Sequence, residues 1–258
     1  MNFFETFSGN ISEFNELFQK TKLVHVLPNK VGLSADAYFR KLAAACGIPL
    51  IHDEEPATGK LVIDRWSIIE YNPAKGDTYK YSNTAQPLHI DYSYFSFDIY
   101  AAFIFCEKQA EFGGATRFID VDTIVQILET IDKTLLERLQ NTIIQFGREG
   151  NPVANKKDFI LSKDDLGWRI NWNYFRAKED IVNITLVEDF KRFLDDYIEQ
   201  SGELKELKLQ PGEGVFFHDK RVLHGRNSFI GNRLLNKAGI VTTVPDIVKK
   251  LIAEGRQN

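Results

Sequence analysis

Two short segments, far apart in the chain, carry the residues best suited to bind a metal ion. The first is Leu88–Asp91, in which His89 and Asp91 are separated by one residue, and the second is Arg221–Arg226, which contains His224. Alternate side chains of an extended strand point to the same face, so His89 and Asp91 can reach one ion together. His224 would supply a third ligand from a strand that is remote in sequence.

Two imidazoles and one carboxylate that share one face of an octahedron leave the opposite face of the metal open. This donor set is typical of non-haem iron(II) oxygenases. The residues alone leave open two alternatives to an oxygenase. A metal-dependent hydrolase would place the same ligands around zinc, but it usually needs a glutamate base, and no Glu lies close to either segment. A non-catalytic β-sandwich binding protein would carry these histidines incidentally.

Composition narrows the classes of partner. The 258 residues carry a net charge of −4 with scattered lysines and arginines, so nothing favours nucleic acid or a membrane surface. The first residues lack a basic start and a long apolar stretch, so we expect neither a signal peptide nor a membrane span. Cys46 and Cys106 form no CxxC pair, which argues against a disulfide framework. We therefore expect a cytoplasmic protein that acts on a small molecule.

Hydrophobic periodicity predicts three helices. One begins after Ser34 and ends before Gly47, and a longer one covers 120–139. A third begins at the capping residue Thr185 and ends at Gly202.

Much of the remaining chain has the composition of β-strands. Runs rich in β-branched and aromatic residues predict strands at 61–63, 66–71, 100–106, 168–173, 214–217 and 238–244. Short strands with a few helices indicate a mainly β fold with helical decoration, for which a double-stranded β-helix (jelly roll) is the best fit. No repeat or linker is visible, so residues 1–258 are expected to form one domain with a helical insertion within 120–202.

The segment 72–88 is polar, irregular and leads directly into His89. A long loop of this composition in a compact domain is often functional. We predict that it forms a lid over the metal site.

Four stretches together resemble one known family. They are Gln86–Tyr92, Gly113–Thr116, Phe217–Arg226 and Arg233–Leu235, and the resemblance covers roughly residues 60 to 245 in order. The family is that of the TauD/TfdA-like dioxygenases, which depend on iron(II) and 2-oxoglutarate.

The resemblance implies a role for each matching residue. His89, Asp91 and His224 would bind iron(II), while Thr116 and Arg233 would hold the distal carboxylate of 2-oxoglutarate, with dioxygen as the second co-substrate. The planar fork of an arginine suits such bidentate capture of a carboxylate. Halogenases of this fold carry a similar motif in which a small residue replaces the aspartate. The presence of Asp91 therefore favours oxygen insertion over halogenation.

The substrate is less clearly indicated. Some members carry a second arginine four positions after the first, and Lys237 stands there in this chain, which keeps the charge but loses the fork. Because the second arginine binds the sulfonate in the family members that act on taurine, this difference argues against taurine itself as the substrate. Further candidate substrate contacts are Asn83, Gln86, Tyr94 and Asn173, with Arg176 in the same stretch as Asn173. We expect hydroxylation of an unactivated carbon of a small polar metabolite, an amino acid or a similar zwitterion or anion, with release of succinate and CO2.

A third histidine, His218, precedes His224 by six positions. An even offset could place both on one face of a continuous strand. We expect Asp219–Arg221 to form a turn between them, and we therefore interpret His218 as a structural residue.

Overall fold

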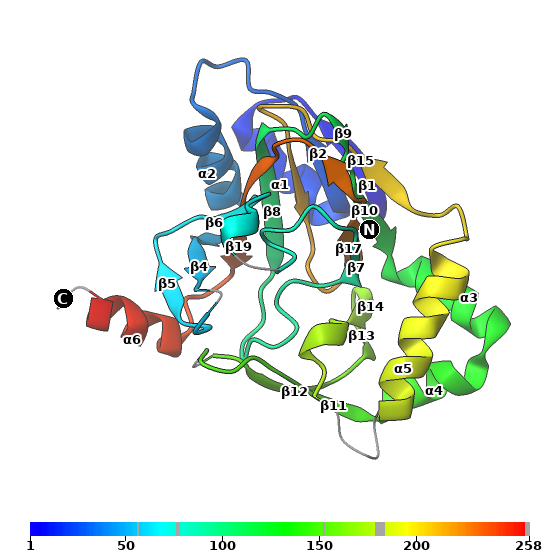
Figure 1. Cartoon of the computed structure of the whole chain (residues 1–258). Coiled ribbons are helices and arrows are strands. Elements are labelled where there is room, and N and C mark those ends of the chain that lie inside the picture. Colours follow the sequence, from blue (N-terminus) through cyan, green and yellow to red (C-terminus); the bar gives the residue numbers. More distant parts are fainter. Residues whose placement is uncertain (56, 76–77, 152, 179–183, 256–258) are drawn as a thin grey trace.

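The computed structural model describes residues 1–258 apart from 56, 76–77, 152, 179–183 and 256–258. Its largest element is a seven-stranded sheet in the order β1-β2-β16-β8-β19-β3, in which β6 also pairs with β19 (Figure 1). The β1–β2 pair is parallel and the other pairs are antiparallel. Its strands are β1 (Asn2–Phe7), β2 (Thr21–Val26), β3 (Ile48–Leu50), β6 (Ser67–Glu70), β8 (Ala101–Lys108), β16 (Gly214–Phe217) and β19 (Leu234–Val241).

A second, four-stranded sheet has the order β15-β10-β17-β7. All of its neighbouring strands are antiparallel. In this sheet His89 lies directly opposite His224, so two residues 135 positions apart in sequence become cross-strand neighbours. Its strands are β7 (Gln86–His89), β10 (Thr116–Asp120), β15 (Lys205–Leu207) and β17 (Val222–Arg226).

Strand β8 is apolar over most of its length because both of its faces are buried. Ile104 and Cys106 belong to the core that contains residues of both sheets, whereas Phe105 belongs to the core under the N-terminal helices. Phe105 stacks on Phe39 of α2 (Ala35–Cys46), with 4.9 Å between the ring centroids. A strand covered on both faces reads as a continuous apolar run rather than as an alternating one.

The helix predicted for 120–139 is two helices. Helix α3 (Val121–Ile131) ends at Asp132, which also begins α4 (Lys133–Asn141). The Asp132 side chain accepts a hydrogen bond from the backbone N–H of Leu135 at 2.9 Å, so the residue acts as an N-cap inside the apolar pattern. The apolar period continues across the break, which is why the sequence reads as one helix.

The predicted third helix also differs in detail. Helix α5 (Ile184–Phe193) contains Thr185 rather than beginning after it, and it continues as the π-helical segment η3 (Leu194–Ile198). Region 120–202 therefore contains helices, but it also contains two hairpins. These are β11 (Ile143–Gly147) with β12 (Asn155–Phe159), and β13 (Leu161–Asp164) with β14 (Gly167–Ile170).

The remaining elements are short. Helices α3, α4 and α5 form one group in Figure 1, well separated from α2. The chain is mainly β with surrounding helices, as predicted. No helix among the described residues is long and apolar enough to cross a membrane. The other elements are α1 (Ile11–Lys20), β4 (His52–Glu54), β5 (Leu61–Ile63), η1 (Pro73–Lys75), β9 (Phe112–Gly113), η2 (Tyr174–Arg176), β18 (Phe229–Ile230) and α6 (Asp246–Gly255).

His218 follows the last strand residue of β16 and is buried by aromatic rings. Its imidazole lies parallel to the ring of Phe18 with 4.4 Å between centroids, and its Nε2 donates to the carbonyl of Phe18 at 3.1 Å. The N–H of Arg221 donates to the carbonyl of His218 at 2.9 Å, which closes the predicted turn. The structure therefore confirms His218 as a structural residue.

Burial lowers the pKa of His218 to about 4, from an unfolded value near 6.5. Between these two pH values the unfolded chain binds a proton at His218 and the folded protein does not. His218 should therefore lower the free energy of unfolding as the pH falls from about 6.5 to about 4. The full difference is about 3 kcal/mol. Urea unfolding of the metal-free protein across this range should show a smaller pH dependence for His218→Gln than for the wild type. An equal pH dependence in His218→Gln and in the wild type would contradict this assignment.

Candidate metal centre and its cavity

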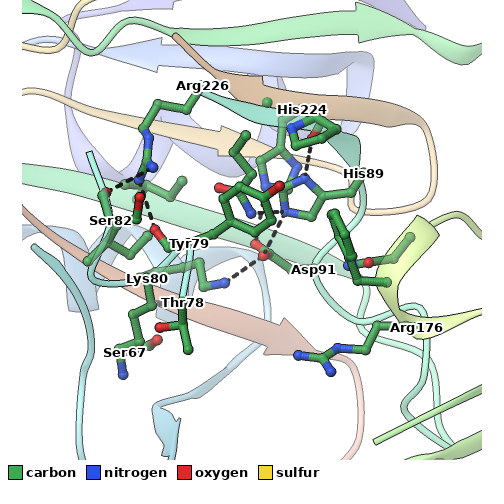
Figure 2. A pocket seen from close by; sticks show the side chains of 18 of the residues that line it. Ser67, Thr78, Tyr79, Lys80, Ser82, His89, Asp91, Arg176, His224 and Arg226 are labelled. Carbon is green, nitrogen blue, oxygen red and sulfur yellow. Dashed lines mark hydrogen bonds and ion pairs between the residues drawn. The ribbon is translucent and has the colours of Figure 1, made fainter. Parts of the chain in front are cut away.

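The structure brings His89, Asp91 and His224 together. One ligand atom from each residue lies within 4.8 Å of the others. The imidazole centroids of His89 and His224 are 4.3 Å apart across the β7–β17 pair, and Asp91 lies two residues after the end of β7. Nε2 of His89 is 3.6 Å from Oδ1 of Asp91, and Nε2 of His224 is 3.4 Å from Oδ2. Figure 2 shows the three side chains turned toward one another.

The protonation of the imidazoles suits metal binding. Nδ1 of His89 is 2.9 Å from the carbonyl of Pro87, and because a carbonyl only accepts, this nitrogen carries the proton. Nε2 of His89 therefore presents a lone pair, which currently accepts from the amide of Gln86 at 3.1 Å. Burial lowers the pKa of His224 to about 4, so this ring is neutral at pH 7. His89 can thus donate an electron pair through Nε2, and the neutral ring of His224 offers one unprotonated ring nitrogen.

Asp91 is ionised although it is buried. Burial alone would raise its pKa, but the Lys237 ammonium holds the pKa well below its usual value. Oδ1 accepts from Nζ of Lys237 at 2.6 Å. Oδ2 is buried and accepts no hydrogen bond from any described residue. A buried carboxylate oxygen without a donor, facing two imidazoles, fits a divalent metal ion such as iron(II).

Lys237, which was predicted to contact the substrate, lines the cavity and also binds Asp91. It lies on β19 of the large sheet and reaches across to Asp91. It thereby occupies one oxygen of the carboxylate and leaves the other available. No sequence pattern links two residues that are 146 positions apart.

The second predicted pair, Thr116 and Arg233, is also brought together. Nη2 of Arg233 donates to Oγ1 of Thr116 at 3.4 Å. Nε and Nη1 of Arg233 are buried and have no hydrogen-bond partner among the described residues. Burial and the nearby Arg226 lower the pKa of Arg233 to about 9, so it remains a cation at pH 7. A buried guanidinium without a counter-ion is unfavourable unless an anionic ligand joins it.

Arg226 is buried beside Arg233 and binds backbone instead of a carboxylate. It donates to the carbonyls of Tyr79, Ser82 and Thr84 at 3.1, 3.0 and 2.7 Å. All three acceptors belong to the segment 72–88, which the sequence predicts to be a lid. Figure 2 shows Arg226 reaching toward Tyr79 and Ser82. The described part of that segment is therefore fastened to the strand that carries His224.

The metal-ligand candidates lie in the wall of a cavity of about 670 Å³. Of the sequence-predicted substrate contacts, Gln86, Tyr94, Asn173 and Lys237 line it, whereas Asn83 does not. The carbonyl of Asn83 instead accepts from the N–H of Phe229 at 3.0 Å.

One wall of the cavity could not be read from the sequence. Glu54 pairs with Arg148 and also accepts from the hydroxyl of Tyr94 at 2.9 Å. Nearby, Asp53 pairs with Lys80. These ion pairs join segments that are remote in sequence, and no motif marks them. Arg176 lines the same cavity and packs over the ring of Tyr94, with 5.1 Å from Cζ to the centroid.

The sequence is similar to known dioxygenases. γ-Butyrobetaine dioxygenase of Homo sapiens is 26% identical over 159 residues, which make up 58% of this chain and 41% of that protein. Mitochondrial trimethyllysine dioxygenase of Bos taurus is 27% identical over 197 residues, covering 68% of this chain and 44% of that protein. The chain thus spans less than half the length of these two curated relatives.

Solved structures share the fold, and a family model matches the sequence. The structure of an asparagine oxygenase in complex with iron(II), 2S,3S-3-hydroxyasparagine and succinate matches with a TM-score of 0.65 and 11% identity, covering 90% of this chain and 78% of that chain. The model of the taurine catabolism dioxygenase TauD, TfdA family matches residues 5–238. Because that match covers most of the chain, the protein belongs to the taurine catabolism dioxygenase TauD, TfdA family.

Proposed function

We propose that this protein is an iron(II)- and 2-oxoglutarate-dependent dioxygenase. It hydroxylates an unactivated carbon of a small polar metabolite, an amino acid or a similar zwitterion or anion, and releases succinate and CO2. The observation that carries the proposal is the convergence of His89, Asp91 and His224 in the wall of a cavity that also contains the unpaired cation of Arg233. Family membership supports it, as does the iron- and succinate-bound asparagine oxygenase of the same fold.

His89, Asp91 and His224 would hold iron(II), with dioxygen as a co-substrate. The bound metal supplies the oxidising chemistry, in which 2-oxoglutarate is decarboxylated and oxygen is inserted into a C–H bond. The chain contributes two imidazole nitrogen donors and one carboxylate. No general base is required, because the substrate loses a hydrogen from carbon rather than a proton.

Arg233 and Thr116 would bind the distal carboxylate of 2-oxoglutarate. Two guanidinium nitrogens without another partner among the described residues can donate to a carboxylate, and the hydroxyl offers a further donor. The segment 72–88 would act as the lid, held to the site by Arg226. Gln86, Tyr94 and Asn173 stay proposed substrate contacts. Lys237 would act mainly through Asp91, to which it is bound.

The sheets and the core support the wider expectations. The two sheets enclose one core, to which α3, α4 and α5 also contribute, so we infer a jelly roll formed by a single domain. The cytoplasm remains the proposed compartment, because its reducing conditions suit iron(II) and the free thiols of Cys46 and Cys106.

The cavity disfavours the alternative of a zinc hydrolase. Such an enzyme needs a free carboxylate base near the metal. Glu54 is the glutamate among the described lining residues, and it is engaged by Arg148, Asn151 and Tyr94. A binding protein without catalysis would leave the cluster of donor atoms and the unpaired Arg233 without a purpose.

Anaerobic iron(II) with 2-oxoglutarate should give a visible metal-to-ligand charge-transfer band with the wild-type protein. Asp91→Ala should lose the band, because two imidazoles alone hold the metal weakly, and should lose 2-oxoglutarate turnover to succinate in air. The exposed Asp246 provides a matched control, and Asp246→Ala should keep both signals. Absence of the band in the wild type at saturating iron and 2-oxoglutarate would overturn the proposed function.

Removing the Arg233 charge should separate stability from ligand binding. Arg233→Met removes an unpaired buried cation, so the melting temperature of the ligand-free protein should stay equal or rise. With iron(II) under anaerobic conditions, 2-oxoglutarate at a hundred times its Kd should stabilise the wild type by about 2.7 kcal/mol, roughly 5 to 10 °C for a chain of this size. Calorimetry should show this increase for the wild type alone. An equal increase in Arg233→Met would exclude Arg233 as the carboxylate ligand.

A further inference from the structure

Most of the cations that line the cavity are already engaged. Lys80 pairs with Asp53, Arg148 with Glu54, and Lys237 with Asp91. Arg226 binds backbone carbonyls, and Arg233 is assigned by the proposed function to 2-oxoglutarate. Arg176 differs from these five cations. Its side chain makes no ion pair with any described residue, and its guanidinium lies over the ring of Tyr94. An arginine that lines a cavity without an oxygen partner is available for an anion from solution.

The backbone fixes Arg176 relative to the metal site. It ends the short helix η2 (Tyr174–Arg176), and its N–H donates to the carbonyl of Asn173 at 3.0 Å. Just before η2, the carbonyl of Trp172 accepts from the N–H of Ile90 at 2.8 Å. Ile90 lies between the candidate ligands His89 and Asp91, so this hydrogen bond joins the two segments next to the candidate metal site.

The platform under Arg176 is rigid as well. The hydroxyl of Tyr94 donates to both carboxylate oxygens of Glu54, at 3.1 and 2.9 Å, and Glu54 is held in turn by Arg148. These contacts fix the plane of the Tyr94 ring over which the guanidinium lies. Figure 2 shows Arg176 pointing into the cavity from the side opposite Arg226. The two ends of the cavity therefore each carry an arginine.

The charge of the whole cavity favours an anionic substrate. Six cationic side chains line it, namely Lys80, Arg148, Arg176, Arg226, Arg233 and Lys237, against the three carboxylates of Asp53, Glu54 and Asp91. Iron(II) would add two positive charges and 2-oxoglutarate would remove two, so the excess of positive charge persists after both have bound. A positive site of this kind attracts anions and repels a purely cationic molecule.

We propose that Arg176 forms the subsite for an anionic group of the prime substrate, a carboxylate, and that the oxidised carbon lies between this group and the metal centre. This proposal rests on the proposed function and deepens it. It makes Arg176 the residue that selects substrates by charge. Sulfonates share the same chemistry of recognition, and the experiment distinguishes the two anions.

The test compares wild type, Arg176→Gln and Arg176→Lys. The probes are free L-amino acids, their C-terminal amides, matching alkyl sulfonates and choline, each assayed for stimulated succinate release in air. A compound with the carboxylate should stimulate the wild type, while its amide should not. Arg176→Gln should raise KM for that compound by about 10- to 100-fold, as expected when a charge-assisted hydrogen bond is lost, and Arg176→Lys should recover part of the effect.

Controls separate this proposal from the proposed function. The anaerobic charge-transfer band with iron and 2-oxoglutarate should be the same in wild type and in all Arg176 variants, because neither ligand needs the subsite. Arg192 is exposed on α5, and Arg192→Gln should leave KM unchanged. A wild type that shows the band but prefers amides or choline, responds to sulfonates alone, or responds to no carboxylate overturns the subsite. An unchanged KM in Arg176→Gln does the same, whereas a missing band in the wild type overturns the proposed function instead.

Discussion

The pairing of β7 with β17 is the constraint on which the candidate site depends. It places His89 opposite His224, and the alternation of side chains along an extended chain then turns Asp91 toward the same point. A slip of one residue would send His89 to the other face and leave His224 without its neighbour. The register of β17 is also fixed along its other edge, where it pairs with β10. There the fully buried Phe118 lies opposite His224. The metal site thus depends on sheet packing.

Around this point the protein buries more positive charge than it neutralises. Arg226 relieves its own burial by donating to three backbone carbonyls, which shapes the segment that carries Tyr79 and Ser82. Arg233 has no equivalent acceptor and keeps two buried nitrogens unpaired. The energy of that arrangement is unfavourable in the empty protein, and the carboxylate proposed to bind here would remove the penalty. Carboxylate binding and stability would then be coupled through Arg233.

The sequence revealed those parts of the site that lie in short motifs. The spacing of His89 and Asp91 is local, so strand geometry alone predicted their shared direction. Thr116 and Arg233 are ordinary residues in isolation, and only the resemblance to a family identified them. The ion pair of Lys237 with Asp91 was not predicted, because the reach of Lys237 between the sheets depends on packing that periodicity does not encode. The helix break at Asp132 was missed for a related reason, since the apolar period continues through the cap.

The cavity wall formed by Glu54, Arg148 and Tyr94 determines which polar groups can contact a substrate, although no sequence motif marks these residues. These three residues come from a short strand, a loop and the segment after the metal ligands, and each satisfies the polar groups of another. Glu54 is thereby removed as a base and Arg148 as an anion receptor, while the Tyr94 ring is fixed as a platform. What remains exposed to a ligand is the guanidinium of Arg176 above that ring. The carboxylates of Asp53 and Glu54 are also paired with cations, so we assign the chemistry to the candidate metal centre.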